Sequence, residues 1–235
     1  MKIFATGHAS RLSELKEKID PVHFVQYETA SPASIDFAGN FGSFDLLFDL
    51  NADDDAAGLS GYAALYQKPV IVCAVKKSLH QLCRHFEGEI NCHLIGMNAL
   101  PTFINRSKTE VSFSSADSAN FFEQIAKLLN WEYLAVEDKV GMVTPRVIAM
   151  VINEACFTLQ EKTATKEDID TAMKLGTNYP WGPFEWCDRI GIKDVYETLE
   201  AIAKDTGDSR YKICELLRDK FLTGASFYVQ KTNLK

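Results

Sequence analysis

"PVIVCAV" (residues 69–75) contains no charged side chain, and a second mostly apolar run, DLLFDL (45–50), precedes it. Nearly continuous apolar runs of this length are typical of strands that are buried on both faces of a parallel sheet. The segment between the two runs, 55–67, is expected to form a helix. A helix between two buried strands is the repeating unit of α/β proteins. These residues therefore predict an α/β fold.

The same alternation of strands and helices extends in both directions from this stretch. Upstream, a helix over 11–19 separates two expected strands, and downstream a helix over 117–130 separates two more. The expected strands outside the central pair are KIFATG (2–7), HFVQYE (23–28), CHLIGMN (92–98), EVSFS (110–114) and EYLAV (132–136). We predict that residues 1–137 form an open, mostly parallel, Rossmann-like sheet domain.

Beyond Glu137 the pattern becomes helical throughout. Residues 143–159 carry a broad apolar face at helical spacing, wider than one neighbouring helix normally covers. We therefore predict that residues 138–235 form a separate, all-helical domain. Three of its expected helices are 143–159, 193–204 and 209–221. Another is capped by Thr165, with Asp168 three residues later, and ends at Gly176. The fifth begins at Pro183, has Glu185 in its first turn and ends at Gly191.

The composition excludes several functional classes. The chain of 235 residues has 32 acidic and 25 basic residues, a net charge of −7 and no block of basic residues. A surface for nucleic acid or for an anionic membrane is therefore not expected. Every apolar segment is shorter than the ~18 residues of a membrane span, and the N-terminal run is too short for a signal peptide. The six dispersed cysteines fit reduced thiols, so we expect a cytoplasmic protein.

One group of residues has the ligand types of a zinc site: His80, Cys83, His85, Cys92 and His93. Cys92 and His93 are adjacent on an expected strand, which directs neighbouring side chains to opposite faces of the sheet. We therefore interpret the five as scattered core and surface residues, and we predict no metal.

A long signature lies in the helical half. DIDTAMKLGTNYPWGPFEWCDRIG (168–191) resembles the signature of 3-hydroxyacyl-CoA dehydrogenase C-terminal domains, in which D-I-D-x-A-M-x-x-G-x-x-x-P-x-G-P-F-E-x-x-D recurs. GASFY (224–228) is similar to the segment that closes this domain, and VEDKVGMVTPRVIAMVINEA (136–155) falls in the family's order. The resemblance implies NAD-dependent oxidation of 3-hydroxyacyl-CoA thioesters in fatty acid metabolism. It also implies a homodimer formed through the C-terminal domain. We interpret the aromatic residues Trp181, Phe184 and Trp186 as packing or interface residues rather than as a surface for a ligand.

The family binds NAD on a glycine-rich turn, G-x-G-x-x-G, which lets the backbone approach the pyrophosphate. In this chain the three glycine positions are Gly7, Ala9 and Leu12. Glu28, at the end of the second expected strand, is the candidate for the acidic residue that accepts a ribose hydroxyl. Ala9 adds a methyl group where the phosphates approach, and Leu12 is far bulkier than a glycine. The resemblance implies NAD as the cofactor, and these two substitutions weaken that expectation.

The family's catalytic base is a histidine, and a glutamate in the next strand holds it in one tautomer. Glu110 matches the glutamate, but twelve positions before it Asn98 occupies the histidine position. A carboxamide has no useful basicity near neutral pH, so the proton acceptor is missing. The alternative base is His93, which is expected at the other end of the same strand.

Two polar side chains fix the substrate oxygen in the family, a serine after a strand and an asparagine at the start of the first long C-terminal helix. Lys77 falls at the serine position, with Ser78 beside it, and Pro145 falls at the asparagine position. Proline has neither a side-chain donor nor a backbone N–H, whereas the adjacent Arg146 matches the family. The interval 28–45 is also too short for the helical excursion that contributes to CoA binding in the family.

These substitutions fall on catalytic and cofactor positions, whereas the scaffold positions match. We therefore expect a dehydrogenase-like protein that is catalytically impaired and acts as an acyl-CoA- or nucleotide-binding protein or as a dimeric scaffold. One alternative is a working NAD-dependent oxidoreductase in which His93, Lys77 or Glu110 replaces the base. The other is a different reaction in the same cleft.

Overall fold

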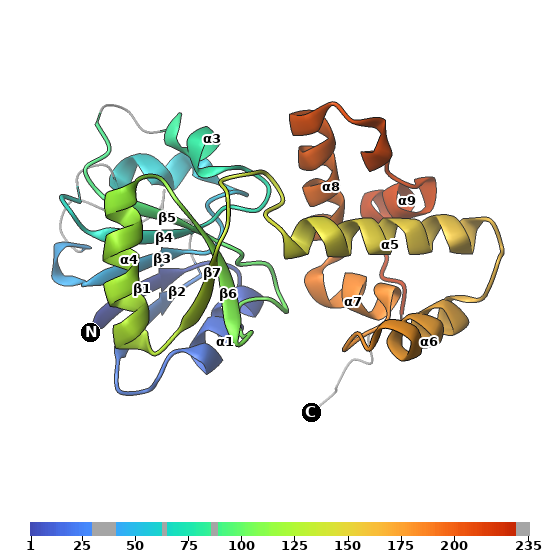
Figure 1. Cartoon of the computed structure of the whole chain (residues 1–235), viewed down its shortest axis with the longest axis horizontal. Coiled ribbons are helices and arrows are strands. Elements are labelled where there is room, and N and C mark those ends of the chain that lie inside the picture. The colour runs from blue at the N-terminus through green and yellow to red at the C-terminus, as the bar shows by residue number, and fades with distance from the viewer. Residues whose placement is uncertain (30–40, 63–64, 86–88, 229–235) are drawn as a thin grey trace. The chain divides into compact units, whose positions relative to one another are not determined.

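The structure, a computed structural model, describes residues 1–29, 41–62, 65–85 and 89–228. The chain forms two compact units, Met1–Val143 and Thr144–Lys235. The first unit is an α/β domain and the second is helical, which confirms the predicted fold class (Figure 1). The boundary lies after Val143 rather than after Glu137, because the intervening residues are hydrogen-bonded to the first unit.

In the part of the chain that the structure describes, seven strands form one sheet in the order β2-β1-β3-β4-β5-β6-β7. Neighbouring strands are parallel, except that β5 and β6 are antiparallel. Every residue of β3 and β4 is buried, as predicted for strands that are covered on both faces. The strands are β1 (Lys2–Thr6), β2 (Phe24–Glu28), β3 (Leu46–Asp49), β4 (Pro69–Cys73), β5 (His93–Met97), β6 (Lys108–Phe113) and β7 (Glu132–Ala135).

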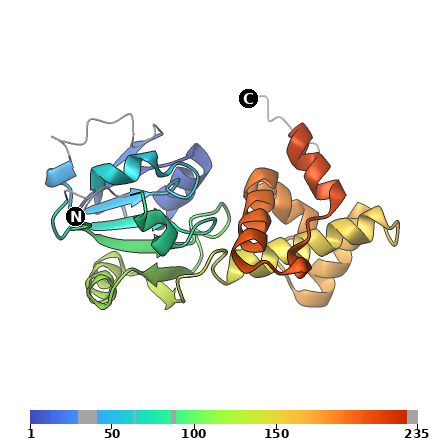
Figure 2. The same cartoon turned by 90° about the horizontal axis from the view of Figure 1, so that it is seen from above.

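Helices cover both faces of this sheet. The helical elements of the first unit are α1 (Ala9–Lys18), η2 (Phe41–Ser43), η3 (Ala56–Tyr62), α3 (Leu79–Cys83) and α4 (Ala116–Leu129), of which η2 and η3 are 3-10 helices. Figure 2 shows η3 and α4 on opposite faces. A buried aromatic group forms part of the core, in which the rings of Phe4 and Phe41 meet edge to face at 4.7 Å.

Two local expectations differ from the structure. In place of the helix expected over 55–67, the described residues of this segment form the seven-residue 3-10 helix η3, because Gly58 and Gly61 lower the helix propensity. The short helix α3 has no counterpart among the expected helices. It begins with a capping box in which the Ser78 hydroxyl accepts the Gln81 N–H at 3.2 Å. The short interval predicted between the second and third strands includes residues 30–40, which lie outside the described residues.

The second unit is built around its longest helix, α5, which packs against the other α-helices of the unit. The single helix expected over 209–221 is divided into a 3-10 turn and a separate α-helix. The elements are α5 (Thr144–Gln160), α6 (Lys166–Thr177), α7 (Pro183–Ile190), α8 (Ile192–Thr206), η4 (Ser209–Tyr211) and α9 (Glu215–Thr223). Within the described part of the chain, none of the helices is long and apolar enough to cross a membrane.

The helix ends of the second unit follow most of the local signals in the sequence. As predicted, Thr165 caps α6, Pro183 begins α7 and Gly191 ends it. The prediction that Gly176 follows the end of α6 is wrong, because the helix continues to Thr177. Asn178 ends it in the left-handed conformation, at φ 55°. Asparagine reaches this conformation more readily than other side chains, so it takes the role predicted for the glycine.

Candidate functional site

The carboxyl ends of the parallel strands lie along one edge of the sheet. In an open α/β sheet, ligands bind at this edge where the strand order reverses. Here that point lies between β1 and β3, because β2 pairs with one side of β1 and β3 with the other. Thr6, at the end of β1, is in register with both Glu28 and Asp49. We take this edge as the candidate site of the first unit.

The predicted cradle residues lie at the turn from β1 into α1. A Cβ added to Gly7 would lie 2.8 Å from the Leu50 Cβ, so the close approach of the two strand ends requires a glycine there. Ala9 is exposed in the first turn of α1, whereas Leu12 is buried. Leu12 therefore contributes to the core at the position where the family has a packing glycine.

Glu28 lies beside Gly7, whose N–H donates to the Glu28 carbonyl at 3.2 Å. The Glu28 carboxylate accepts a hydrogen bond from the Gln26 amide at 3.1 Å. The next N–H of the turn, that of His8, donates to the Asn51 amide oxygen at 3.1 Å. The structure thus brings Gly7 and Glu28 together and also places the Asn51 side chain at the start of α1.

A buried ion cluster, consisting of Arg11, Asp53, Asp54 and Lys76, lies at the same edge. Arg11 Nη1 is 3.8 Å from Asp53 Oδ1, and Arg11 Nη2 is 3.1 Å from Asp54 Oδ2. Lys76 also pairs with Asp54. The side chains of Arg11 and Asp53 have no exposed surface. The sequence analysis missed this cluster, whose signal is the acidic run NADDD (51–55) directly after a buried strand.

Asp49 is a second buried acidic group at this edge, at the end of β3. Burial raises the pKa of its carboxyl group from 3.8 to about 7. Two hydrogen bonds oppose this rise, one from the Asn51 N–H at 3.1 Å and one from the Tyr62 hydroxyl at 3.2 Å. Asp49 therefore changes its charge near neutral pH.

Asn98 directly follows β5, Glu110 lies on the antiparallel neighbour β6, and both are buried. The Asn98 N–H donates to the Glu110 carbonyl at 3.1 Å. The Asn98 amide oxygen accepts the Leu100 N–H at 3.4 Å, and Glu110 Oε2 accepts the Val143 N–H at 3.1 Å. The structure thus brings together the two residues that we predicted at the family's histidine and glutamate positions, and both side chains bind backbone groups.

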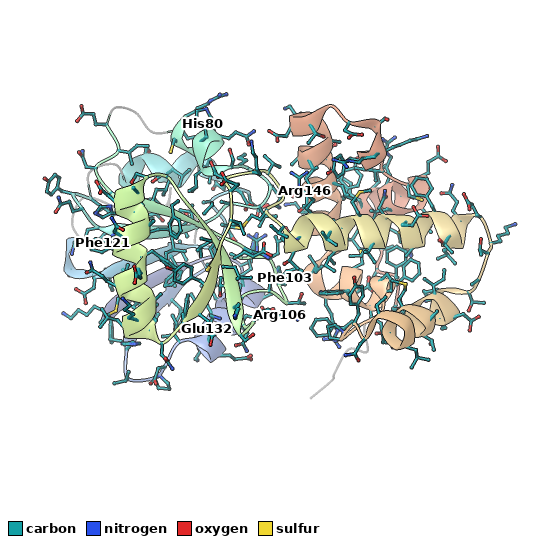
Figure 3. All side chains as sticks on the ribbon, in the orientation of Figure 1. His80, Phe103, Arg106, Phe121, Glu132 and Arg146 are labelled. Atoms are coloured by element: carbon teal, nitrogen blue, oxygen red, sulfur yellow. The ribbon has the colours of Figure 1, made fainter. Side chains whose placement is uncertain are left out.

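Lys77 and Ser78 follow β4 at the same edge. The Ser78 hydroxyl is the N-terminal cap of α3, and Lys77 is half-buried beside it. His93 begins β5, at the opposite end of the strand from Asn98. Its ring stacks on Phe121 of α4, with the ring centroids 4.6 Å apart (Phe121 is labelled in Figure 3). The alternative base His93 is therefore not at the candidate site.

Pro145 and Arg146 belong to the second unit, in the first turn of α5 (Arg146 is labelled in Figure 3). Pro145 is buried and offers neither a side-chain donor nor an N–H. Arg146 Nη1 donates to the Tyr211 hydroxyl at 2.8 Å, and its guanidinium group lies over the same ring at 5.6 Å. Arg146 therefore holds η4 against α5.

The residues of the long signature make contacts within the second unit. Asp170 accepts the Phe184 N–H and the Tyr228 hydroxyl, each at 2.8 Å, and burial raises the pKa of its carboxyl group. A side chain at Gly182 would overlap Asp170. Asp188 accepts the N–H of Tyr228 at 2.7 Å and also that of the residue before it. These contacts join α6, α7 and the closing GASFY segment.

The aromatic residues of the signature pack, as the sequence predicted. The ring centroids of Trp181 and Trp186 are 5.6 Å apart, and those of Phe184 and Phe227 are 4.7 Å apart. Phe184 is fully buried at the start of α7.

Comparison with known proteins shows what the second unit is. Residues 141–228 match the family 3-hydroxyacyl-CoA dehydrogenase, C-terminal domain. The chain is 42% identical over 94 residues to 3-hydroxyadipyl-CoA dehydrogenase of Escherichia coli, covering 40% of this chain and 20% of that protein. It is 36% identical over 105 residues to a probable 3-hydroxybutyryl-CoA dehydrogenase of Bacillus subtilis, covering 45% and 37%. The matched part thus spans well under half the length of these relatives.

The fold of the whole chain also has solved counterparts. The crystal structure of (S)-3-hydroxybutyryl-CoA dehydrogenase from Ralstonia eutropha is similar with a TM-score of 0.69 at 18% identity, covering 95% of this chain and 94% of that one. At this level of identity the likeness shows a shared fold, a Rossmann-like sheet followed by a helical domain. The sequence resemblance is confirmed for the second unit: residues 141–228 match the C-terminal domain of 3-hydroxyacyl-CoA dehydrogenases.

Proposed function

We propose that this 3-hydroxyacyl-CoA dehydrogenase-like protein has lost the dehydrogenase reaction and keeps a binding or scaffold role. The observation that carries the proposal is the pair Asn98–Glu110. The base of the family would stand at Asn98, and a carboxamide cannot accept the substrate's proton near neutral pH. The Glu110 carboxylate, which would orient a histidine, accepts the Val143 N–H at 3.1 Å instead.

The other candidate groups support the same conclusion. Pro145 supplies no polar group at the asparagine position, and the Ser78 hydroxyl is engaged in capping α3. His93 is stacked on Phe121 at the far end of β5. Loss of a general base alone typically lowers a reaction rate by ~10²–10⁴-fold. We therefore expect a turnover rate far below that of a working dehydrogenase.

The test mixes the purified protein with NADH and acetoacetyl-CoA and follows the absorbance of the reduced nicotinamide. We expect no enzyme-dependent decay. A robust decay would overturn the proposal and favour the alternative, an NAD-dependent oxidoreductase acting on 3-hydroxyacyl-CoA with a replaced base. In that event Glu110→Gln, His93→Gln and Lys77→Met would identify the base, with Glu132→Gln on exposed strand β7 as the matched control.

The binding role makes a separate prediction about stability. A ligand that binds the folded state raises the apparent stability of a protein. Thermal unfolding in the presence of acetoacetyl-CoA and of other acyl-CoA thioesters therefore measures this role directly. A rise in melting temperature supports acyl-CoA binding. If no thioester changes the melting temperature, acyl-CoA binding is contradicted and the scaffold role is the part of the proposal that remains.

We infer further that the scaffold is a homodimer formed through the second unit. Val147 on α5 keeps 50% of its surface exposed. Helices α5 and α6 line an apolar hollow of about 470 Å³, to which Val151, Ile169 and Met173 contribute. Light scattering should give the mass of a dimer, and Val147→Asp should shift it toward the monomer, with exposed Leu222→Asp on α9 as the matched control. A monomeric wild-type mass would contradict the dimer.

A further inference from the structure

The side chains of Leu50 and Asn51 lie against the turn from β1 into α1, at the point where the strand order reverses. A dinucleotide places its pyrophosphate against exposed glycine backbone and the N–H groups at the start of a helix. At Gly7 the Leu50 side chain approaches so closely that an added Cβ would lie 2.8 Å from the Leu50 Cβ. At the next residue, the His8 N–H already donates to the Asn51 amide oxygen at 3.1 Å. Because the Gly7 N–H donates to the Glu28 carbonyl at 3.2 Å, the N–H groups of both Gly7 and His8 are engaged within the chain.

The charges of the crevice also oppose a phosphate. Arg11 lies in the first turn of α1, and its side chain is fully buried. Its guanidinium group donates to the Leu50 carbonyl and pairs with the carboxylates of Asp53 and Asp54. These carboxylates neutralise the arginine, so it offers no net positive charge to a phosphate.

The ion cluster connects three separate segments of the first unit. Arg11 belongs to α1, Asp53 and Asp54 follow β3, and Lys76 follows β4. Asp53 Oδ2 accepts the N–H groups of Val75 at 3.0 Å and Lys76 at 2.8 Å, and Asp54 pairs with the Lys76 ammonium group. The cluster therefore ties the start of α1 to the two loops at the carboxyl edge of the sheet.

We propose that this ion cluster takes the place of a dinucleotide: it closes the crevice to NAD(H) and holds the surrounding segments together. NAD is the cofactor that the family resemblance implies, and the residues present do not fit it. The proposal rests on the proposed function in one respect, because the dehydrogenase-like origin of the fold is the reason to expect NAD.

The binding half is tested on the full wild-type chain by titration with NADH, following nicotinamide fluorescence, and by thermal unfolding with NADH present. We expect no saturable signal and no rise in melting temperature up to about 1 mM NADH, the upper end of ordinary enzyme affinities. Saturable NADH binding with a rise in melting temperature would overturn the proposal. If NADH binds but is not oxidised by acetoacetyl-CoA, the proposal that the crevice is closed to NADH is wrong, whereas the proposal that the dehydrogenase reaction is lost still holds. If NADH is oxidised, both are wrong.

The structural half is tested by variants of α1. Arg11→Met should lower the melting temperature by roughly 6–20 °C, because breaking a buried ion pair leaves its partners uncompensated. Lys16→Met, at an exposed position of the same helix, is the matched control and should leave it unchanged. If Arg11→Met does not fold, Arg11→Lys should give a smaller fall, because lysine keeps the charge but not the planar fork. If either Arg11 variant has the melting temperature of the wild type, the proposal that the ion cluster holds these segments together is overturned.

Discussion

The stability of the first unit should depend on pH through one buried group, Asp49. Its side chain lies at the end of β3 with 0% exposure, and burial raises its pKa from 3.8 to about 7. Because this pKa is higher in the folded than in the unfolded state, the folded state binds the proton more tightly. The stability contributed by Asp49 is therefore fully present below about pH 4 and is lost as the pH rises through about 7.

The size of this effect follows from the two pKa values. The difference between 3.8 and about 7, at about 1.36 kcal/mol for each pKa unit, corresponds to about 4 kcal/mol of unfolding free energy. Asp49→Asn removes the titration and keeps the shape, since an amide can accept the Asn51 N–H and donate to the Tyr62 oxygen. The variant should be more stable than the wild type at about pH 8.5, and this advantage should shrink toward about pH 5.

Urea denaturation across this pH range is the appropriate assay. The fluorescence of Trp131 reports on the first unit, because its ring packs against Phe48 at 5.9 Å, beside Asp49. The measurement requires a background in which the other two tryptophans, both in the second unit, are replaced by phenylalanine. Asp45→Asn, at an exposed position just before β3, is the matched control for the loss of one carboxylate. Curves of unfolding free energy against pH that stay parallel for wild type and Asp49→Asn would refute the reasoning.

Three further substitutions test contacts that the structure assigns. Glu110→Ala should speed hydrogen exchange at the Val143 amide, measured by mass spectrometry, because the carboxylate that accepts this N–H is removed. Glu110→Gln keeps an acceptor and is the control. Equal exchange in both variants would show that Glu110 does not hold the Val143 N–H. Asp170→Ala should destabilise the second unit by about 2–4 kcal/mol in thermal unfolding, because buried donors lose their acceptor. Exposed Glu161→Ala is its control. Gly182→Ala should cost about 1–3 kcal/mol through overlap with Asp170, and an unchanged melting temperature would rule that overlap out.

Much of the fold could be predicted because its signals are local. The strands β3 and β4 are buried at every residue, and every one of these residues except Asp49 is apolar. The start of α7 follows from Pro183 at its first position and from the Glu185 carboxylate, which accepts the Gly182 N–H at 3.0 Å. Such signals involve residues only a few positions apart, and sequence alone is sufficient to detect them.

The candidate site was harder to predict because its contacts join distant segments. Arg11 on an amphipathic helix resembles a surface residue, and its burial depends on carboxylates that follow β3. The Glu110 carboxylate accepts the backbone N–H of Val143, and a backbone group has no sequence signature. The role of Asn178 at the end of α6 was missed because nearby Gly176 offered a competing signal of the same kind.

The signature identifies the family more firmly than it identifies a reaction, and the reason is physical. Asp170 and Asp188 accept backbone N–H groups inside the second unit, and Gly182 is needed for the fit beside Asp170. Losing these contacts would leave buried donors without acceptors, whether or not a substrate is turned over. Asn98 is different, because its amide oxygen accepts the Leu100 N–H at 3.4 Å and thus satisfies the fold without serving as a base. The contacts of the signature are therefore needed for the fold of the second unit whether or not the chain catalyses the family's reaction.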